Sequence, residues 1–280
     1  MLQPSSAAVP GRHTVFAEHP AVVAHRGLGR GLVSGLRENT VESVLAAVAL
    51  GARWVEVDVR RTRDDRLVVR HDPTTDDGVF VVDQTAEEVE AKGVVRLETL
   101  LGALPDGVGI DLELKTSLED APRSAATSTA ALLSPLARTA SASRPVLVTS
   151  FDAAALLTVR SLVPAIPLGL LTWLCFPLRK AIPAAAHLGV QVVGVHQGSF
   201  VPNHLDGASV DRPVDYAVEV AHRACLEVMA WCPEPDQAVE LVAAGIDAVC
   251  VNEVGTALAT LNPSGTALPH PPDSTPERPR

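Results

Sequence analysis

The chain has 280 residues and a formal net charge of -10, and 47% of its residues are hydrophobic. That much apolar surface excludes a globally disordered chain, and the acidic balance argues against a broad nucleic-acid-binding face, which needs clustered Lys and Arg. The four cysteines form no CxxC pair, which argues against a zinc knuckle and is typical of a reduced, cytoplasmic protein.

The two ends of the chain differ from its middle. Residues 1–20 contain no apolar run of signal-peptide length, and we interpret them as a loose N-terminal arm. Residues 262–280 are rich in proline and are expected to be a disordered tail. The uncharged stretch 162–178 is interrupted by three prolines, so it predicts a short buried strand and an apolar loop rather than a membrane span.

Between these ends, residues 21–261 alternate short Val-rich runs with Ala- and Leu-rich stretches that are typical of helices. Eight parallel strands with intervening helices predict an α/β fold, the (β/α)8 TIM barrel. An open doubly wound sheet is the competing architecture, but the turn 27–31 lacks GxGxxG spacing. The predicted strands are 21–25, 53–59, 108–114, 145–149, 168–172, 191–196, 226–231 and 247–252.

A ninth apolar run, 67–70, follows the second strand too closely for a parallel crossover, which needs a dozen or more residues. It is therefore expected to return antiparallel, as a hairpin that turns at Asp64 and Asp65. The residues after it, 72–104, are expected to form a small insertion in the barrel.

Acidic side chains recur near the ends of two predicted strands. Glu56 and Asp58 share one side of their strand, and Asp111 and Glu113 repeat this pattern. Carboxylates that face one barrel mouth repel each other, and a hard divalent cation such as Mg²⁺ or Ca²⁺ removes that repulsion. The alternative is a set of structural ion pairs with nearby Arg and Lys residues, which we favour for the deeper Asp111.

Histidines and cations follow other strands. His25 and His71 are candidates for a general base and a general acid near neutral pH. Arg26 and Lys115 supply the local positive charge that a phosphate needs, although they could simply neutralise the carboxylates. His196 is a weaker candidate, and a structural histidine is at least as good an interpretation.

Three further residues are candidates for binding substrate. Asn39 could hydrogen-bond a group at the mouth, although Asn39 or Thr40 as a helix N-cap is a sufficient explanation. Phe151 and Trp231 end predicted strands and could form the wall of a pocket. The apolar loop 173–177 is expected at the same mouth.

The motifs in this order resemble the glycerophosphodiester phosphodiesterase family. They are Ala24-His25-Arg26-Gly27, Glu38-Asn39-Thr40, Glu56-Val57-Asp58, His71-Asp72 and Glu113-Leu114-Lys115. The resemblance covers residues 21–258. It implies a TIM barrel in which Glu56, Asp58 and Glu113 bind Mg²⁺ or Ca²⁺, His25 and His71 act as acid and base, and Arg26 and Lys115 hold the phosphate.

The resemblance implies hydrolysis of a small glycerophosphodiester to glycerol 3-phosphate and an alcohol. The chain departs from the family at Cys232-Pro233-Glu234 and at Asn252-Glu253, where pocket shape is set. The alternatives are a lysophospholipase-D-like enzyme, whose lysolipid would contact the apolar loop, a lyase that forms cyclic phosphates, and a phosphodiester-binding protein without activity. The sequence does not indicate the oligomeric state.

Overall fold

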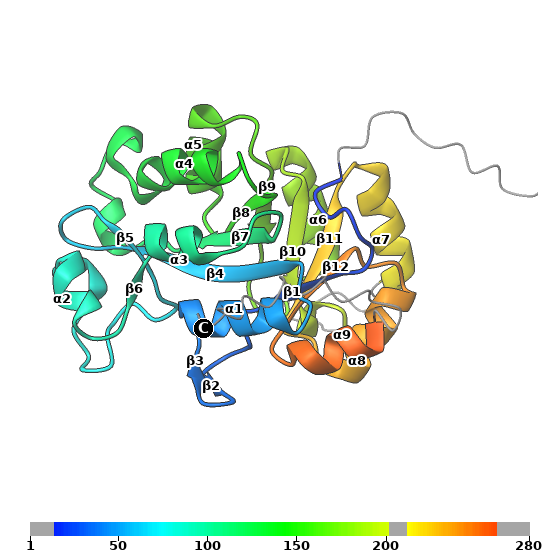
Figure 1. Ribbon diagram of the computed structural model, residues 1–280. Coiled ribbons are helices and arrows are strands. Elements are labelled where there is room, and N and C mark those ends of the chain that lie inside the picture. The colour runs from blue at the N-terminus through cyan, green and yellow to red at the C-terminus, as the bar shows by residue number, and fades with distance from the viewer. Residues whose placement is uncertain (1–13, 202–211, 262–280) are drawn as a thin grey trace, which may run out of the picture.

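The computed structural model describes residues 14–201 and 212–261, in which eight parallel strands close into a barrel (Figure 1). The strands pair in chain order around the barrel, and β1 closes it by pairing with both β12 and β4. The predicted (β/α)8 fold is therefore confirmed. The strands are β1 (Ala21–Ala24), β4 (Trp54–Arg61), β7 (Gly109–Leu114), β8 (Val146–Ser150), β9 (Leu168–Leu171), β10 (Val192–His196), β11 (Glu227–Trp231) and β12 (Ala248–Val251).

Helices surround the strands, and the main apolar core fills the space between the two layers. On β4, Val55, Val57 and Val59 face this core, so the residues between them face the barrel interior. The helices are α1 (Val41–Ala49), α3 (Leu97–Ala103), α4 (Thr129–Ala140), α5 (Ala153–Leu162), α6 (Leu178–Leu188), α7 (Val214–Arg223), α8 (Pro235–Ala243) and α9 (Val254–Leu261).

A second apolar cluster lies inside the barrel. It fills the end at which the strands begin, whereas the inward-facing polar residues lie nearer to the C-terminal ends of the strands. The cluster includes Phe16, whose ring is fully buried and meets the Trp54 ring edge-on at 5.2 Å. The expectation of a loose arm is therefore wrong for residues 14–20, because burial of Phe16 holds this segment against the barrel. Residues 1–13 and the predicted tail 262–280 lie outside the described residues.

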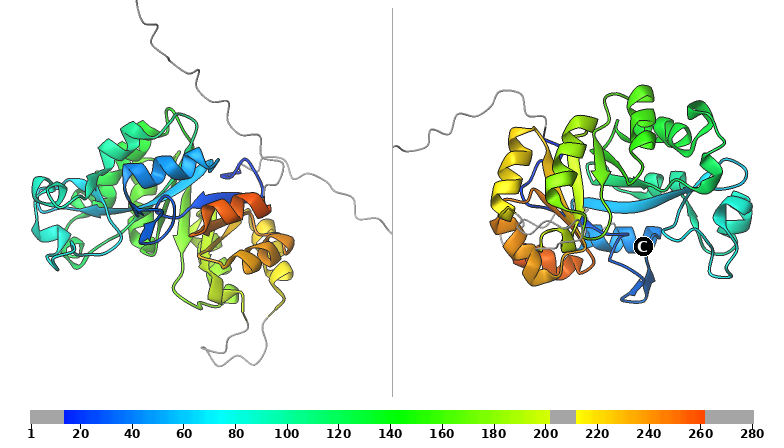
Figure 2. Two further views of the ribbon diagram at one scale, coloured as in Figure 1. Left: turned by 60° about the horizontal axis from the view of Figure 1, so that its bottom comes forward. Right: turned by 180° about the vertical axis from the view of Figure 1, so that it is seen from behind.

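The hairpin after the second barrel strand is present as predicted. β5 (Leu67–Val69) pairs antiparallel with the end of β4, which lengthens β4 to Arg61. β6 (Val95–Arg96) and the short helix α2 (Ala86–Glu90) complete a lobe on the side of the barrel opposite α7 and α8 (Figures 1 and 2). Helix α3 packs into the main core through Leu97 and Leu100, so the last part of the predicted insertion is a barrel helix.

The loop after β1 contains a small hairpin that the sequence analysis did not predict. It joins β2 (Leu32–Val33) and β3 (Leu36–Arg37) and projects beside α1 (Figure 1). Gly29 lies at its base with φ of +130°, and an added Cβ would meet the Asn252 backbone oxygen at 2.1 Å. Only glycine fits this close approach between the first and last βα loops.

The uncharged stretch 162–178 contains the buried strand β9 and the whole loop from β9 to α6, as predicted. Among the helices that the structure describes, none combines the length and the apolar character that a membrane crossing requires.

Candidate active site

Three buried carboxylates meet at the C-terminal end of the barrel. Asp58 on β4 pairs in register with Glu113 on β7, and Glu56 lies two residues below Asp58. One oxygen from each side chain lies within 4.8 Å of the others. The deeper Asp111 accepts a hydrogen bond of 2.8 Å from the Thr149 hydroxyl, which gives it a structural partner.

Two cations lie among these carboxylates. The Lys115 ammonium is 2.9 Å from Asp58 Oδ1 and also contacts Glu113 Oε1. The Arg26 guanidinium is 3.2 Å from Asp58 Oδ2, and the Arg26 backbone N–H donates to Glu56 Oε2 at 3.0 Å. The cations therefore neutralise part of the carboxylate charge, with Asp58 at the centre.

Burial and charge separate the pKa values of the carboxylates. Burial, with the charges of Asp58 and Glu113, raises the pKa of Glu56 well above its usual range. Burial alone would raise the pKa of Asp58 too, but Lys115 and Arg26 hold it well below its usual range. Burial and the charge of Asp58 raise the pKa of Glu113. The crowding of the carboxylates thus disfavours the charged forms of Glu56 and Glu113, whereas the two cations favour the charged form of Asp58.

Asn39 belongs to the site rather than to a helix cap. Its carboxamide nitrogen donates to Asp58 Oδ2 at 2.8 Å, and its oxygen accepts from the Asp58 backbone N–H at 3.2 Å. Thr40 is the N-cap of α1, because its side chain accepts a hydrogen bond from the Ser43 backbone N–H. Of the two N-cap candidates, Thr40 therefore has that role.

His25 is buried beside the carboxylates and held from several sides. Its Nδ1 lies 2.7 Å from Asn252 Oδ1 and 3.6 Å from Cys232 Sγ. Its Nε2 accepts from Arg26 Nε at 3.2 Å and lies 3.8 Å from Glu56 Oε2. Burial lowers the pKa of His25, but the contacts with Cys232 and Asn252 outweigh burial and raise it overall.

His71 lies at the rim, with 38% of its side chain exposed. Its Nδ1 is 2.8 Å from Asp72 Oδ1, and its backbone carbonyl accepts a 2.8 Å hydrogen bond from Arg60 Nε. Burial lowers the pKa of His71, and the attraction of Asp58 opposes that effect only in part. These contacts fix the loop after β5 through Nδ1 and the carbonyl, and no hydrogen bond of Nε2 is made within the described residues.

A pocket of about 450 Å³ connects His71 with the residues at the mouth. Arg26 and Asn39 line it from the barrel side, and the loop after β1 and the β5–β6 lobe form its other walls. Its lining is strongly charged, as a polar or anionic ligand requires. Its charged side chains are Arg26, Arg30, Arg37, Glu38, Arg70, Asp72 and Asp76.

Aromatic rings form another side of the mouth. Phe151 stacks on Trp173 with a centroid distance of 4.6 Å and meets Trp231 edge-on at 6.0 Å. The Lys115 ammonium lies 5.8 Å from the centre of the Phe151 ring. His196 packs on Trp231 at 4.4 Å, outside the carboxylate cluster, which favours its structural interpretation. Phe151 and Trp231 thus lie against each other at the mouth, and neither lines the polar pocket, so their role as the wall of a substrate pocket stays a prediction.

Sequence reasoning missed the groups that hold the site residues in place. Glu38 pairs with the Arg26 guanidinium at 3.0 Å, although it stood in a quoted motif. Cys232 and Asn252 contact His25 across more than 200 positions of sequence. The available signals for Cys232 and Asn252 were their departure from the family motifs and their place at the ends of the predicted strands 226–231 and 247–252, where side chains converge at the mouth.

The carboxylate cluster fits a hard divalent cation. Glu56 Oε1 is buried and accepts no hydrogen bond from any residue that the structure describes. A buried carboxylate oxygen without a partner is costly, and three converging carboxylates offer the oxygen ligands that Mg²⁺ and Ca²⁺ prefer. The residues that could hold the ion are Glu56, Asp58 and Glu113.

Comparisons with known proteins match most of the chain to one family. A family model described as "Glycerophosphoryl diester phosphodiesterase family" matches residues 25–256. The glycerophosphocholine phosphodiesterase gde1 of Schizosaccharomyces pombe is 40% identical over 87 residues, which are 30% of this chain. The match spans 7% of the length of that much longer protein.

Solved structures share the fold. A phosphodiesterase of Oleispira antarctica, solved with the product sn-glycerol-3-phosphate, aligns with a TM-score of 0.67 and 24% identity, over 87% of this chain and 97% of that one. A glycerophosphodiester phosphodiesterase of Thermotoga maritima aligns with a TM-score of 0.65 and 20% identity, over 88% and 100%. At these identities the likeness establishes the barrel fold alone.

Proposed function

The chain belongs to the glycerophosphoryl diester phosphodiesterase family, and we propose that it hydrolyses small glycerophosphodiesters to glycerol 3-phosphate and an alcohol. One observation carries the proposal. Three buried carboxylates, two cations and a fixed histidine converge at the catalytic end of the barrel, beside a polar pocket that a second histidine lines. This combination suits a phosphodiester, because each of its parts meets one requirement of phosphoryl transfer.

A divalent cation, Mg²⁺ or Ca²⁺, held by Glu56, Asp58 and Glu113 would polarise a phosphoryl oxygen and offset the developing negative charge. The unpartnered Glu56 oxygen and the crowding of carboxylate charge support this assignment.

Arg26 and Lys115 would bind the remaining phosphate oxygens. Each already forms an ion pair with Asp58, Arg26 at 3.2 Å and Lys115 at 2.9 Å, so the positions of both cations are fixed before substrate arrives. Asn39 donates to Asp58 Oδ2, the oxygen that Arg26 also contacts, and thereby keeps this anchor in place. Fixed cations stabilise the transition state without the cost of reorganising during the reaction.

The two histidines would transfer the protons. In each ring Nδ1 is bonded to an oxygen, of Asn252 in His25 and of Asp72 in His71, so Nε2 is the nitrogen that would exchange the proton. In His25, Nε2 accepts from Arg26 Nε, and substrate would replace this contact. One Nε2 takes a proton from the attacking hydroxyl, of water or of the glycerol moiety. The other gives a proton to the oxygen of the departing alcohol as its bond to phosphorus breaks.

The apolar loop after β9 favours a second candidate substrate, a lysophospholipid. Trp173 and Leu174 are 69% and 60% exposed, and Trp173 stacks on Phe151 at the edge of the mouth. Exposed apolar side chains beside a polar site suit a substrate with an acyl chain. A reaction that stops at the cyclic phosphate would use the same histidines, so product analysis must separate it from complete hydrolysis.

The test is release of glycerol 3-phosphate from glycerophosphocholine, with Mg²⁺ or Ca²⁺ and with EDTA. We expect release with metal and its loss with EDTA. Turnover of lysophosphatidylcholine alone would establish the second candidate, and a persistent cyclic phosphate would establish the lyase reaction. Tight binding of glycerophosphocholine without turnover would overturn the proposal in favour of a binding protein.

A further inference from the structure

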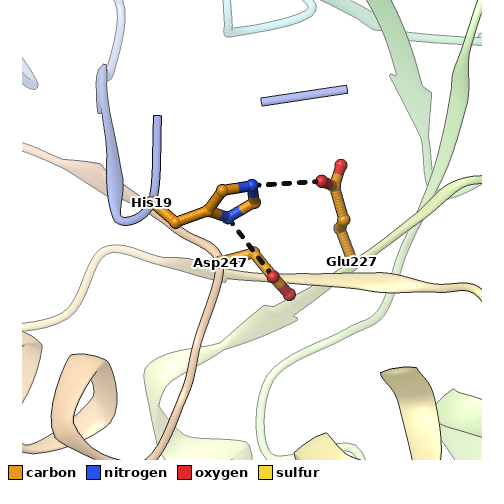
Figure 3. Close-up of side chains that lie close together, drawn as sticks. All are labelled: His19, Glu227 and Asp247. Carbon is orange, nitrogen blue, oxygen red and sulfur yellow. Dashed lines mark ion pairs between the residues drawn. The ribbon is translucent and has the colours of Figure 1, made fainter. Parts of the chain in front are cut away.

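A separate group of titratable side chains lies at the other end of the barrel. His19 precedes β1, Glu227 begins β11, and Asp247 immediately precedes β12, so all three lie at the N-terminal ends of strands. The His19 ring lies between the two carboxylates (Figure 3). The group is therefore distinct from the candidate active site at the C-terminal ends of the strands.

Glu227 has one oxygen in use and one without a hydrogen bond. Its Oε2 accepts from the Val15 backbone N–H at 2.8 Å. Its Oε1 is buried, accepts no hydrogen bond from the described residues, and lies 3.7 Å from His19 Nε2. The whole side chain is only 4% exposed, so water cannot readily replace the missing partner.

Asp247 shows the same division between its oxygens. Its Oδ2 accepts from the Val228 backbone N–H at 2.7 Å and lies 2.8 Å from His222 Nε2. Its Oδ1 lies 3.4 Å from His19 Nδ1, and the side chain is 6% exposed. Each carboxylate is thus fixed through one oxygen and directs the other toward the imidazole.

This arrangement leaves buried negative charge with little compensation. The ion-pair partners of both carboxylates within the described part of the chain are histidines, His19 and His222. A bound cation would compensate this charge and satisfy the buried Oε1 of Glu227, which accepts no hydrogen bond from the described residues.

We propose that His19, Glu227 and Asp247 form a second metal site, which takes Zn²⁺ or a similar first-row divalent ion. One nitrogen of His19 and one oxygen of each carboxylate lie within 4.8 Å of one another. A mixed set of imidazole and carboxylate ligands suits Zn²⁺, whereas Mg²⁺ and Ca²⁺ prefer oxygen alone. The side chain of His19 is 40% exposed, which gives the ion a path from solvent.

His222 would act as a positioning residue for this site. It pairs with the Asp247 oxygen that does not face His19, and such outer contacts orient a ligating carboxylate. The ion would connect the segment before β1 with the starts of β11 and β12. This connection lies close to Phe16 in the second apolar cluster. The role of the ion would be structural. An ion that binds the folded chain but not the unfolded chain stabilises the folded state.

The experiment measures Zn²⁺ bound per chain by equilibrium dialysis of the full-length protein, after treatment with chelator. All variants carry Cys225→Ser, because that exposed thiol could bind Zn²⁺ adventitiously. We compare this parent with His19→Gln, with Glu227→Gln, and with His187→Gln, which removes an exposed histidine on α6 as a matched control. Glutamine at 227 keeps an oxygen acceptor for Val15.

The proposal predicts one equivalent fewer in His19→Gln and in Glu227→Gln, and no loss in His187→Gln. Any ion bound at the active site contributes equally to all four proteins and cancels. Zn²⁺ should also raise the unfolding temperature of the parent more than that of His19→Gln. Equal stoichiometry and equal thermal shifts in parent and His19→Gln would overturn the proposal. If both variants failed to fold, X-ray absorption of the parent would decide, since zinc without an imidazole ligand excludes the site.

Discussion

The carboxamide oxygen of Asn252 lies 2.7 Å from Nδ1 of His25, across 227 positions of sequence. The contact joins the last barrel strand to the first and fixes the orientation of the imidazole. The same oxygen accepts the Arg30 backbone N–H at 3.1 Å, so Asn252 itself is held in place.

Replacing Asn252 by Ala should therefore lower kcat by about 10- to 100-fold, the range seen when an outer contact of a functional side chain is lost. KM should change little, because Asn252 does not line the polar pocket. Asn252→Asp keeps the acceptor oxygen and should recover much of the lost rate. Steady-state kinetics on glycerophosphocholine test this, and a rise in KM with an unchanged kcat would show that Asn252 contacts substrate instead.

The histidine that protonates the leaving group can be identified with two substrates. His25→Ala and His71→Ala should each lower turnover of glycerophosphocholine by about 10²- to 10⁴-fold, the usual contribution of general acid–base catalysis. A p-nitrophenyl diester has a leaving group that needs no proton. The variant without the general acid should recover on this substrate, while the variant without the base should not. Near-normal rates in either variant on glycerophosphocholine would remove that histidine from the mechanism.

Gly109 has no side chain, which leaves room for the Trp54 ring inside the barrel. A Cβ at this position would lie 2.5 Å from the Trp54 ring, which is fixed in the core beside Phe16. Gly109→Ala should lower the free energy of unfolding by about 1–3 kcal/mol through overpacking. Gly102 in α3 is the matched control, because a Cβ there meets nothing within 4 Å. Gly102→Ala should stabilise by about 0.5–1 kcal/mol, and urea denaturation of both variants measures the difference.

The lobe around Asp77 should lose stability in acid. A hydrogen bond from Lys92 at 2.7 Å and one from Thr75 at 2.6 Å lower the pKa of Asp77 to about 2. A group with a lowered pKa adds stability above its unfolded pKa, and that stability is lost as the pH falls toward 2. Asp77→Asn should therefore lower the unfolding temperature at pH 6, and the difference from the wild type should vanish near pH 2. A constant difference across this range would contradict the assignment.

The sequence predicted the barrel because alternation and strand spacing are local properties. Val55, Val57 and Val59 mark one face of a strand, so Glu56 and Asp58 had to share the other. The strand ends then placed both carboxylates, Glu113 and His25 at one mouth. These positions follow from periodicity and barrel topology alone.

What could not be predicted depends on contacts between distant segments. Cys232 and His25 are in contact although 207 positions of sequence separate them. The burial of Phe16 depends on its contact with the Trp54 ring. The hairpin β2–β3 has two-residue strands, which are too short to show a period. Asn39 was equally consistent with a helix cap, and only the position of Asp58 distinguished the two roles.

The central claim is that the carboxylate cluster at the mouth supports hydrolysis of a glycerophosphodiester. The most direct test is a ³¹P NMR time course of glycerophosphocholine with Mg²⁺ or Ca²⁺, in the wild type and in Glu56→Gln, which changes the carboxylate whose Oε1 accepts no hydrogen bond from the described residues. The account predicts conversion to glycerol 3-phosphate by the wild type and a loss of at least about 10²-fold in the variant. An equal rate in both proteins, or no phosphomonoester from the wild type with either metal, would contradict it.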